Sequence, residues 1–239
     1  MALPKINETL NFNMTIPSTG QRVKYRPYLV KEEKILLQAF ESKDMQMCLS
    51  AMSDTLSACL EEKANVVVEK LATFDIEYMF TQIRAKSVGE TSDIIITCTE
   101  ESCAEPNEYV VDLETLNIDA PKGSNVVSIT SDISVELKYP TYETMINEGV
   151  KQKEQANSTA LQLITDCISA VLTQDERIDT ASESKESMEE FVSNMTAHQL
   201  KGITEFLENM PALKHDAKFK CKKCGHDNNV LLKGLSDFF

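Results

Sequence analysis

The stretch "FKCKKCGHDNN", residues 219–229, contains two cysteines three positions apart and a glycine directly after the second. Two cysteines at a tight turn direct both sulfurs toward one point, and Gly225 permits the left-handed backbone that such a turn commonly requires. A structural zinc ion takes four protein ligands in a tetrahedron, so this stretch predicts half of a metal site. The other two ligands must come from elsewhere in the chain.

The stretch "IIITCTEESCAEP", residues 94–106, supplies the second pair of cysteines. Cys98 and Cys103 flank four residues between two strand-like runs, just as Cys221 and Cys224 flank two residues. If the two turns face each other, the four thiolates form a tetrahedron with Zn–S bonds of about 2.3 Å, the geometry of a closed structural site. More than a hundred residues separate the pairs, so one zinc ion per chain would join the middle of the chain to its end.

Three alternatives to this zinc site remain open on the sequence alone. The hairpins could fold without a metal and carry incidental cysteines. An iron–sulfur cluster is disfavoured because no further cysteine stands near either pair in the sequence. His226 could replace a sulfur, but it follows Cys224 by only two positions, and we interpret it as a neighbour of the site.

Four thiolates around one zinc ion leave a net charge of about −2, which nearby cations would offset. The lysines placed to do so are Lys214, Lys218, Lys220, Lys222 and Lys223. With four protein ligands no coordination position remains open for water, so the predicted metal is structural and not catalytic. The other cysteines lie on apolar helical faces, which predicts small buried hydrophobic residues: Cys48, Cys59 and Cys167.

The composition is that of a soluble globular protein, with 239 residues, 42% of them hydrophobic and 26% charged. A net charge of −14 argues against nucleic-acid binding, which needs a basic surface. No run of about 20 apolar residues predicts a membrane span, and the first residues lack the apolar core of a signal peptide. We therefore expect a protein of the cytoplasm in which it is made, with no membrane, nucleic acid or small-molecule substrate as partner.

Hydrophobic periodicity predicts an α+β fold. Residues 10–28 alternate apolar and polar positions around "PSTG", which favours a β-hairpin, and three helices follow before residue 90. Residues 93–138 are rich in Val, Ile, Thr and Tyr, which indicates two or more antiparallel hairpins. Helical spacing returns after Tyr142, with one apolar helical face predicted from Leu161, Ile164, Cys167, Ile168 and Val171. Residues 173–186 read as a loop or a charged helix start, and two short helices and a last hairpin close the chain.

These elements predict three parts. Residues 1–90 form an N-terminal hairpin and helical domain. Residues 91–140 and 212–239 form a zinc-ribbon-like β module, in which central hairpins are joined to the C-terminal hairpin through the four cysteines. Residues 141–211 form a helical segment inserted between the two halves of that module.

No catalytic motif stands out in the sequence. The three histidines, His198, His215 and His226, fit no metalloprotease pattern, and no nucleophile elbow or phosphate-binding loop is present. Adjacent acidic residues on predicted helices point apart, which favours solvated faces over an acid–base pair. We therefore predict that the protein is not an enzyme.

Two longer stretches go beyond these physical patterns. "VKYRPYLVKEEKILLQA" (23–39) and "FDIEYMFTQIRAKSVGE" (74–90) resemble the signature segments of the T4-type baseplate hub and hub-assembly family of contractile-tailed bacteriophages. The paired cysteines also resemble the paired-cysteine pattern of that family. The resemblance implies a non-enzymatic structural or assembly role in the tail baseplate, with other hub and spike proteins as partners. It places the protein in the host cytoplasm during assembly and in the virion tail.

Within that setting, the two signature segments and the C-terminal "LSDFF" are the expected contact surfaces. Aromatic and arginine side chains are enriched at interfaces, which selects Tyr25, Arg26, Tyr28, Arg84, Phe238 and Phe239. For Phe80 the core is the expected location. For the terminal phenylalanines, a groove in the same chain and a groove in a neighbour are equally compatible with the sequence.

Two other functions are also compatible with parts of the sequence, one of an adaptor protein and one of an enzyme. A zinc-ribbon adaptor that binds the host transcription machinery is compatible with an acidic surface. A metal-dependent hydrolase would need an open coordination position, which four thiolates do not leave.

Overall fold

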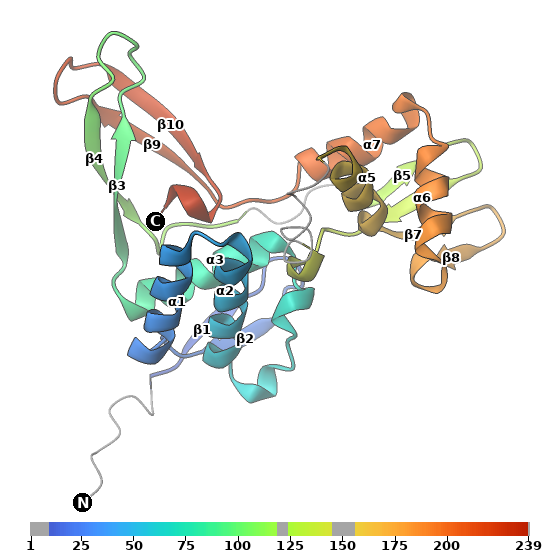
Figure 1. The fold of residues 1–239 in the computed structure, drawn as a ribbon, viewed down its shortest axis with the longest axis horizontal. Helices are drawn as coiled ribbons and strands as arrows, with labels where there is room; N and C mark the ends of the chain where they lie inside the picture. Colours follow the sequence, from blue (N-terminus) through green and yellow to red (C-terminus); the bar gives the residue numbers. More distant parts are fainter. Residues whose placement is uncertain (1–9, 119–123, 145–155, 239) are drawn as a thin grey trace, which may run out of the picture. The chain divides into compact units, whose positions relative to one another are not determined.

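The computed structural model describes residues 10–118, 124–144 and 156–238. It has an α+β fold, as predicted, and the chain divides into two compact units (Figure 1). The first unit comprises residues 1–68, 74–120 and 212–239, and the second comprises residues 69–73 and 121–211. No helix among the described residues combines the length and the apolar character needed to span a bilayer.

The first unit opens with the predicted hairpin and three helices (Figure 1). The strands and helices are β1 (Phe12–Thr15), β2 (Arg22–Tyr25), α1 (Val30–Ser42), α2 (Met45–Cys59) and α3 (Thr73–Ser87). Gly20, with a φ of 68°, takes the left-handed conformation in the β1–β2 turn. Helix α2 begins at Asp44, whose carboxylate accepts the backbone N–H groups of Gln46 and Met47.

Helix α3 supplies much of the core of this part of the unit. Phe74, Ile76, Met79 and Ile83 on α3 are at most 1% exposed. Asp75 is also fully buried, and its two carboxylate oxygens accept the backbone N–H of Ser18 at 2.8 Å and the Ser18 hydroxyl at 2.5 Å. A buried carboxylate is tolerated only with such partners, so Asp75 ties the β1–β2 turn to α3.

The start of α1 contains a partly buried ion pair. Glu32 is 5% exposed, accepts the backbone N–H of Leu29 at 2.8 Å and pairs with the Arg26 guanidinium at 2.9 Å. Burial by itself would raise the pKa of Glu32, but the hydrogen bond from Leu29 and the Arg26 guanidinium hold it below its usual value. The pair fixes the direction in which the chain leaves β2 and begins α1.

Two long hairpins complete the first unit and lie side by side (Figure 1). They are β3 (Thr91–Thr97) with β4 (Pro106–Asp112), and β9 (Lys214–Lys220) with β10 (Asp227–Lys233), each antiparallel. Every second residue of each strand turns inward, as the alternating burial of β3 and β10 shows. The inward side chains form one core, whose fully buried members include Val111, Leu113, Leu213, Ala217 and Phe238.

The second unit contains a four-stranded antiparallel sheet in the order β5–β6–β7–β8. Its elements are β5 (Val126–Ser128), β6 (Ser134–Leu137), α5 (Ala156–Cys167), β7 (Ile168–Leu172), β8 (Arg177–Asp179), α6 (Lys185–Ser193) and α7 (Ala197–Glu208). Helix α7 lies so close to β5 at Gly202 that a Cβ atom at this position would be 2.6 Å from Cγ1 of Val127. Only glycine fits here without a shift of the neighbouring side chain. The two short helices predicted before Pro211 are confirmed as α6 and α7.

Three details differ from the sequence prediction. The hairpin of β5 and β6 pairs with β7 in the second unit, although we had assigned residues 91–140 to the zinc-ribbon-like module. Ile168 and Val171 lie in a strand and not on the α5 face, because the chain passes directly from helix to strand at Cys167. Residues 141–211, predicted as helical, therefore include strands β7 and β8. Residues 168–172 form a strand because their backbone pairs with β6. A run of five apolar residues is too short for its periodicity to distinguish a strand from a helix.

The Asp75 contacts predict a measurable stability effect. Asp75→Ala removes both acceptors from the Ser18 turn, and we expect it to lower the free energy of unfolding by about 2–4 kcal/mol in urea titration. Asp54→Ala, at an exposed position of α2, is the matched control, with an expected change within about 0.5 kcal/mol. Equal stability of the two variants would show that Asp75 does not hold the turn.

Candidate metal centre

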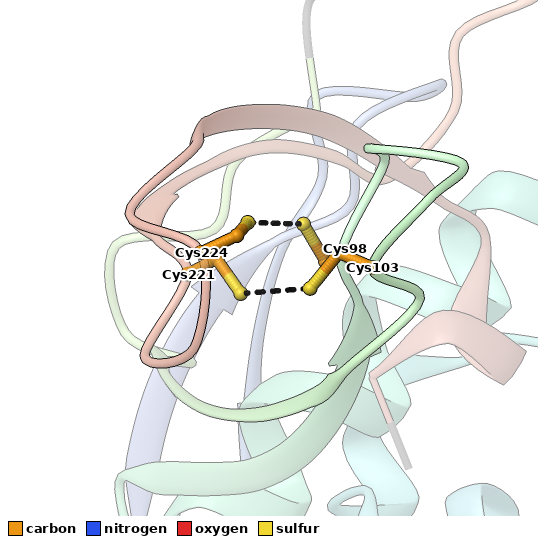
Figure 2. Close-up of side chains that lie close together, drawn as sticks. All are labelled: Cys98, Cys103, Cys221 and Cys224. Carbon is orange, nitrogen blue, oxygen red and sulfur yellow. Dashed lines mark hydrogen bonds between the residues drawn. The ribbon is translucent and has the colours of Figure 1, made fainter.

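The four predicted ligands come together at the tips of the two long hairpins. Figure 2 shows Cys98 and Cys103 from the β3–β4 turn facing Cys221 and Cys224 from the β9–β10 turn. The Sγ atoms of Cys98 and Cys224 are 3.8 Å apart, as are those of Cys103 and Cys221. All four sulfurs lie within 4.8 Å of one another.

These distances fit one tetrahedral ion. With Zn–S bonds of about 2.3 Å, the sulfurs of a regular tetrahedron are about 3.8 Å apart. The same distances exclude disulfides, whose sulfurs are about 2.05 Å apart, and all four cysteines are free thiols. The chemistry of the donors agrees with the geometry, because zinc favours four thiolates in closed sites.

The two turns have related backbone geometry. In the β3–β4 turn the N–H of Cys98 donates to the carbonyl of Glu105 at 2.9 Å, and in the β9–β10 turn the N–H of Cys221 donates to the carbonyl of His226 at 2.8 Å. The residue after the second cysteine has a positive φ in both turns, 43° at Ala104 and 73° at Gly225. Gly225 confirms the left-handed position predicted from the sequence, whereas Ala104 adopts it at a steric cost.

Two buried asparagines cross-link the turns in the same way. Asn228, four residues after Cys224, accepts the backbone N–H of Thr99 in the other turn at 2.7 Å. Asn107, four residues after Cys103, accepts the backbone N–H of Lys222 at 2.9 Å. Each side-chain amide also donates to the carbonyl two residues before it, and both asparagines are 4% exposed. The site therefore has an approximate twofold pattern of two cysteines and one asparagine from each hairpin.

Asn107 and Asn228 were not among the residues predicted from the sequence. The signal was present, because both hairpins have an asparagine four positions after the second cysteine. In the strand that follows each turn, this position faces inward, because Asn107 and Asn228 are buried and their neighbours on either side are exposed. Each asparagine side chain can therefore reach the backbone of the facing turn, and it satisfies N–H groups that would otherwise be buried without a partner.

Charged residues also pair across the two tips. Nζ of Lys223 lies 3.1 Å from the Glu105 carboxylate, and Nδ1 of His226 lies 3.7 Å from the Glu100 carboxylate. His226 is directed at this exposed carboxylate, which agrees with its interpretation as a neighbour of the site. The carboxylate of Glu105 raises the pKa of Lys223, which favours a charged ammonium beside the cysteines.

The thiols differ in how readily they ionise. The backbone N–H groups of Cys224 and Lys223 lower the pKa of Cys221 to about 6. The pKa of Cys224 is raised to about 12: the N–H of His226 lowers it, but burial and the neighbouring thiols outweigh that effect. Several like charges within 4.8 Å repel one another, so only a bound cation would make four thiolates favourable here.

The other cysteines take no part in the cluster. Cys59 and Cys167 are buried, as predicted, and Cys48 is half-buried. Burial raises the pKa of Cys59 to about 11, which makes it an unreactive core residue.

Two residues predicted as partner contacts are inside the chain. Tyr25 is 2% exposed and Phe238 is fully buried, so neither side chain is available on the surface. Phe238 packs in the core between the long hairpins, and its carbonyl accepts the Ser92 hydroxyl at 2.5 Å. Of the two locations compatible with the sequence, Phe238 takes the one in its own chain, where it is fully buried among the apolar side chains of the hairpin core.

The remaining predicted contacts stay partly accessible. Arg26, Tyr28 and Arg84 are half-buried, with Arg26 engaged by Glu32. Burial raises the pKa of Tyr28 to about 12 despite the charge of Arg84 nearby. Phe80 is in the core at 4% exposure, as expected, and Phe239 lies outside the described residues.

The structure is that of an α+β protein in which the tips of two antiparallel hairpins meet at a cluster of four cysteines. A scan against protein-family models matches the family of T4 bacteriophage base plate proteins over residues 9–239, and the chain belongs to this family. A search of curated proteins and a search of solved structures each returned no match. The family match confirms the resemblance to T4-type baseplate proteins and supports a structural role among the proteins of a phage tail.

The asparagine pattern predicts a stability effect. Asn228→Ala leaves the backbone N–H of Thr99 without its acceptor, and we expect it to lower the free energy of unfolding by about 1–3 kcal/mol. Amide hydrogen exchange at Thr99 should also accelerate. Asn229→Ala, on the exposed side of the same strand, is the control and should change stability by less than about 0.5 kcal/mol. Unchanged exchange at Thr99 in the Asn228 variant would contradict the cross-link.

Proposed function

We propose that this protein is a non-enzymatic building block or assembly factor of the baseplate hub in a contractile phage tail, stabilised by one zinc ion on Cys98, Cys103, Cys221 and Cys224. The family match over residues 9–239 carries the baseplate part of this proposal. The four-sulfur cluster carries the zinc part.

Zinc is favoured over the alternatives by the compactness of the cluster. Four sulfurs within 4.8 Å of one another surround the space of a single ion, whereas an iron–sulfur cluster would hold its ligands further apart. The cysteines lie at the tips of two hairpins that share a hydrophobic core, so the ion would close the tip end of the module, whereas Phe238 contacts Ser92 at the other end of β3. Its binding free energy would add to the stability of the fold.

The proposed role is non-enzymatic because the site offers no chemistry beyond structure. Four protein ligands leave zinc no position for water or substrate, and membership in a baseplate family agrees with a structural role. The hypotheses of a transcription adaptor and of a metal-dependent hydrolase gain no support from the family match. Other hub and spike proteins are the proposed partners, reached in part through Arg26, Tyr28 and Arg84.

The zinc proposal predicts loss of metal on loss of one ligand. Cys98→Ser and Cys221→Ser should each lower the zinc content from about one ion per chain to near zero and lower the melting temperature, because metal binding is coupled to folding. Elemental mass spectrometry measures the ratio, and X-ray absorption of the native protein should show four sulfur neighbours at about 2.3 Å.

Cys48→Ser provides the control, since this half-buried cysteine lies on α2 away from the cluster and should leave the zinc content unchanged. Full zinc content in both ligand variants would refute the site. A spectrum with oxygen or nitrogen neighbours would refute the four-thiolate coordination.

The baseplate proposal predicts the protein among tail components. Quantitative mass spectrometry of purified particles and of infected-cell extracts should find the chain in complex with tail proteins. A small fixed ratio in mature particles identifies a building block, and presence only in extracts identifies an assembly factor. If neither sample contains the chain with any tail protein, the proposal is wrong.

A further inference from the structure

Charge is segregated between the two long hairpins. The β3–β4 hairpin, residues 91–112, contains six acidic residues and no lysine or arginine. The β9–β10 hairpin, residues 214–233, contains six lysines and two aspartates, a net charge of +4. These six lysines are a quarter of the 24 basic residues in a chain that has 38 acidic ones. The formal charge is therefore −6 on one hairpin and +4 on the other.

Much of this charge lies on the outward faces of the hairpins. On the β3–β4 hairpin the outward side chains Asp93, Glu108 and Asp112 surround Ile95 and Val110, and we call these five residues the acidic face. Ile95 is 73% exposed and Val110 is 58% exposed. An apolar centre with a charged rim is the usual anatomy of a protein interface.

The β9–β10 hairpin carries the complementary arrangement. Its outward residues include Lys214, Lys218, Lys220 and Lys233 around Leu231, which is 55% exposed, and we call these five residues the basic face. Asp216 and Asp227 also point outward, so the face keeps a surplus of lysines. Both faces are two-stranded and have strands of seven residues, so they match in length as well as in charge.

Contacts inside the chain explain two lysines of the basic face in part: Asp227 lies opposite Lys220 in the sheet, and burial raises the pKa of the Glu77 carboxyl while Lys233 acts to lower it. Among the described residues, none of the four forms an ion pair, and the cross-tip pair to Glu105 uses Lys223 instead. Lys214 lies directly opposite Lys233, an arrangement of like charges that weakens a sheet. Lys214 and Lys218 are therefore the lysines that an external partner explains best.

The cysteine cluster does not explain all of these lysines either. Strands rise about 3.3 Å per residue, which places Lys214, at the start of β9, about 23 Å from Cys221, just past its end. The Debye length is about 8 Å at physiological salt, so Lys214 cannot offset thiolate charge as we had expected from the sequence. That role remains reasonable for Lys220, Lys222 and Lys223 near the tip.

We propose that the basic face of one copy of this chain binds the acidic face of a second copy. Opposite charges at the rims would steer the two faces together, and Leu231 would pack against Ile95 and Val110. Because the two faces are different surfaces, the contact is heterologous, and repetition builds a closed ring or an open chain of copies.

The contact is small, and this sets its expected strength. About five to eight side chains on each side fall short of the 20–30 in a standard interface, so one contact alone is weak and salt-sensitive. The proposal concerns a surface outside the cysteine cluster and does not depend on the hub assignment. A negative result would leave the zinc site and the baseplate role intact, because these are tested by metal content and particle composition.

A charge-swap experiment tests the proposal. One double variant, Lys214→Glu with Lys218→Glu, makes both faces acidic, and the other, Asp93→Lys with Glu108→Lys, makes both faces basic. The four positions are exposed and lie on strands away from the cysteines, so folding should be preserved, as checked by zinc content and melting temperature. Lys34→Glu with Lys63→Glu, at exposed positions of the same unit, is a control of equal charge change.

Sedimentation equilibrium of the full-length chain gives the readout. We expect native protein and control to self-associate at about 50 mM salt and to dissociate at about 500 mM. Each double variant alone should associate at least about tenfold more weakly, and an equimolar mixture of the two should recover association, because each supplies the face the other lacks.

Four results would each overturn the proposal: a native chain that is monomeric at low salt, variants that associate as the native chain does, a control that loses association, or a mixture that fails to recover it. Zero-length cross-linking of mixed isotope-labelled and unlabelled native chains gives independent support. It should join Lys214 or Lys218 of one copy to Asp93 or Glu108 of another.

Discussion

The convergence of two hairpin tips on four cysteine sulfurs is the constraint on which the first unit depends. Four thiols within 4.8 Å of one another cannot all ionise without a cation, so the arrangement is stable as a thiolate cluster only around a metal. Along the rest of their length the hairpins are held by an apolar core that includes Val111, Leu213 and Phe238. A polar end built on the four cysteines and a hydrophobic end thus together join chain segments that lie far apart in the sequence.

This joining explains why the first unit can be built from separated segments. The chain leaves the unit after the β3–β4 hairpin, forms the second unit, and returns as the β9–β10 hairpin. Bringing distant segments together costs loop-closure entropy, and cross-links that close long loops recover the most stability. Asn107 and Asn228 fix how the two turns face each other, because each accepts a hydrogen bond from a backbone N–H of the opposite turn.

The two hairpins have similar inward-facing residues and different outward-facing ones. Inward positions carry the cysteines, the asparagines and the apolar core, which the fold requires in both hairpins. Outward positions carry no such requirement, and there one hairpin is acidic and the other basic. Residues free of folding constraints are the ones available for recognition, which suits a family whose members work within a multiprotein tail.

The sequence by itself determined the local elements and the ligand set, because strand alternation, helical spacing and turn residues act between near neighbours. It predicted the N-terminal hairpin, three helices, the hairpins around each cysteine pair and the meeting of all four cysteines. Only the tertiary structure decided that Tyr25 and Phe238 are buried, that Ile168 begins a strand, and that two asparagines cross-link the turns. An aromatic residue fits a core and an interface equally well, and a short apolar run fits a helix and a strand. Their state depends on partners distant in the chain, which no local pattern contains.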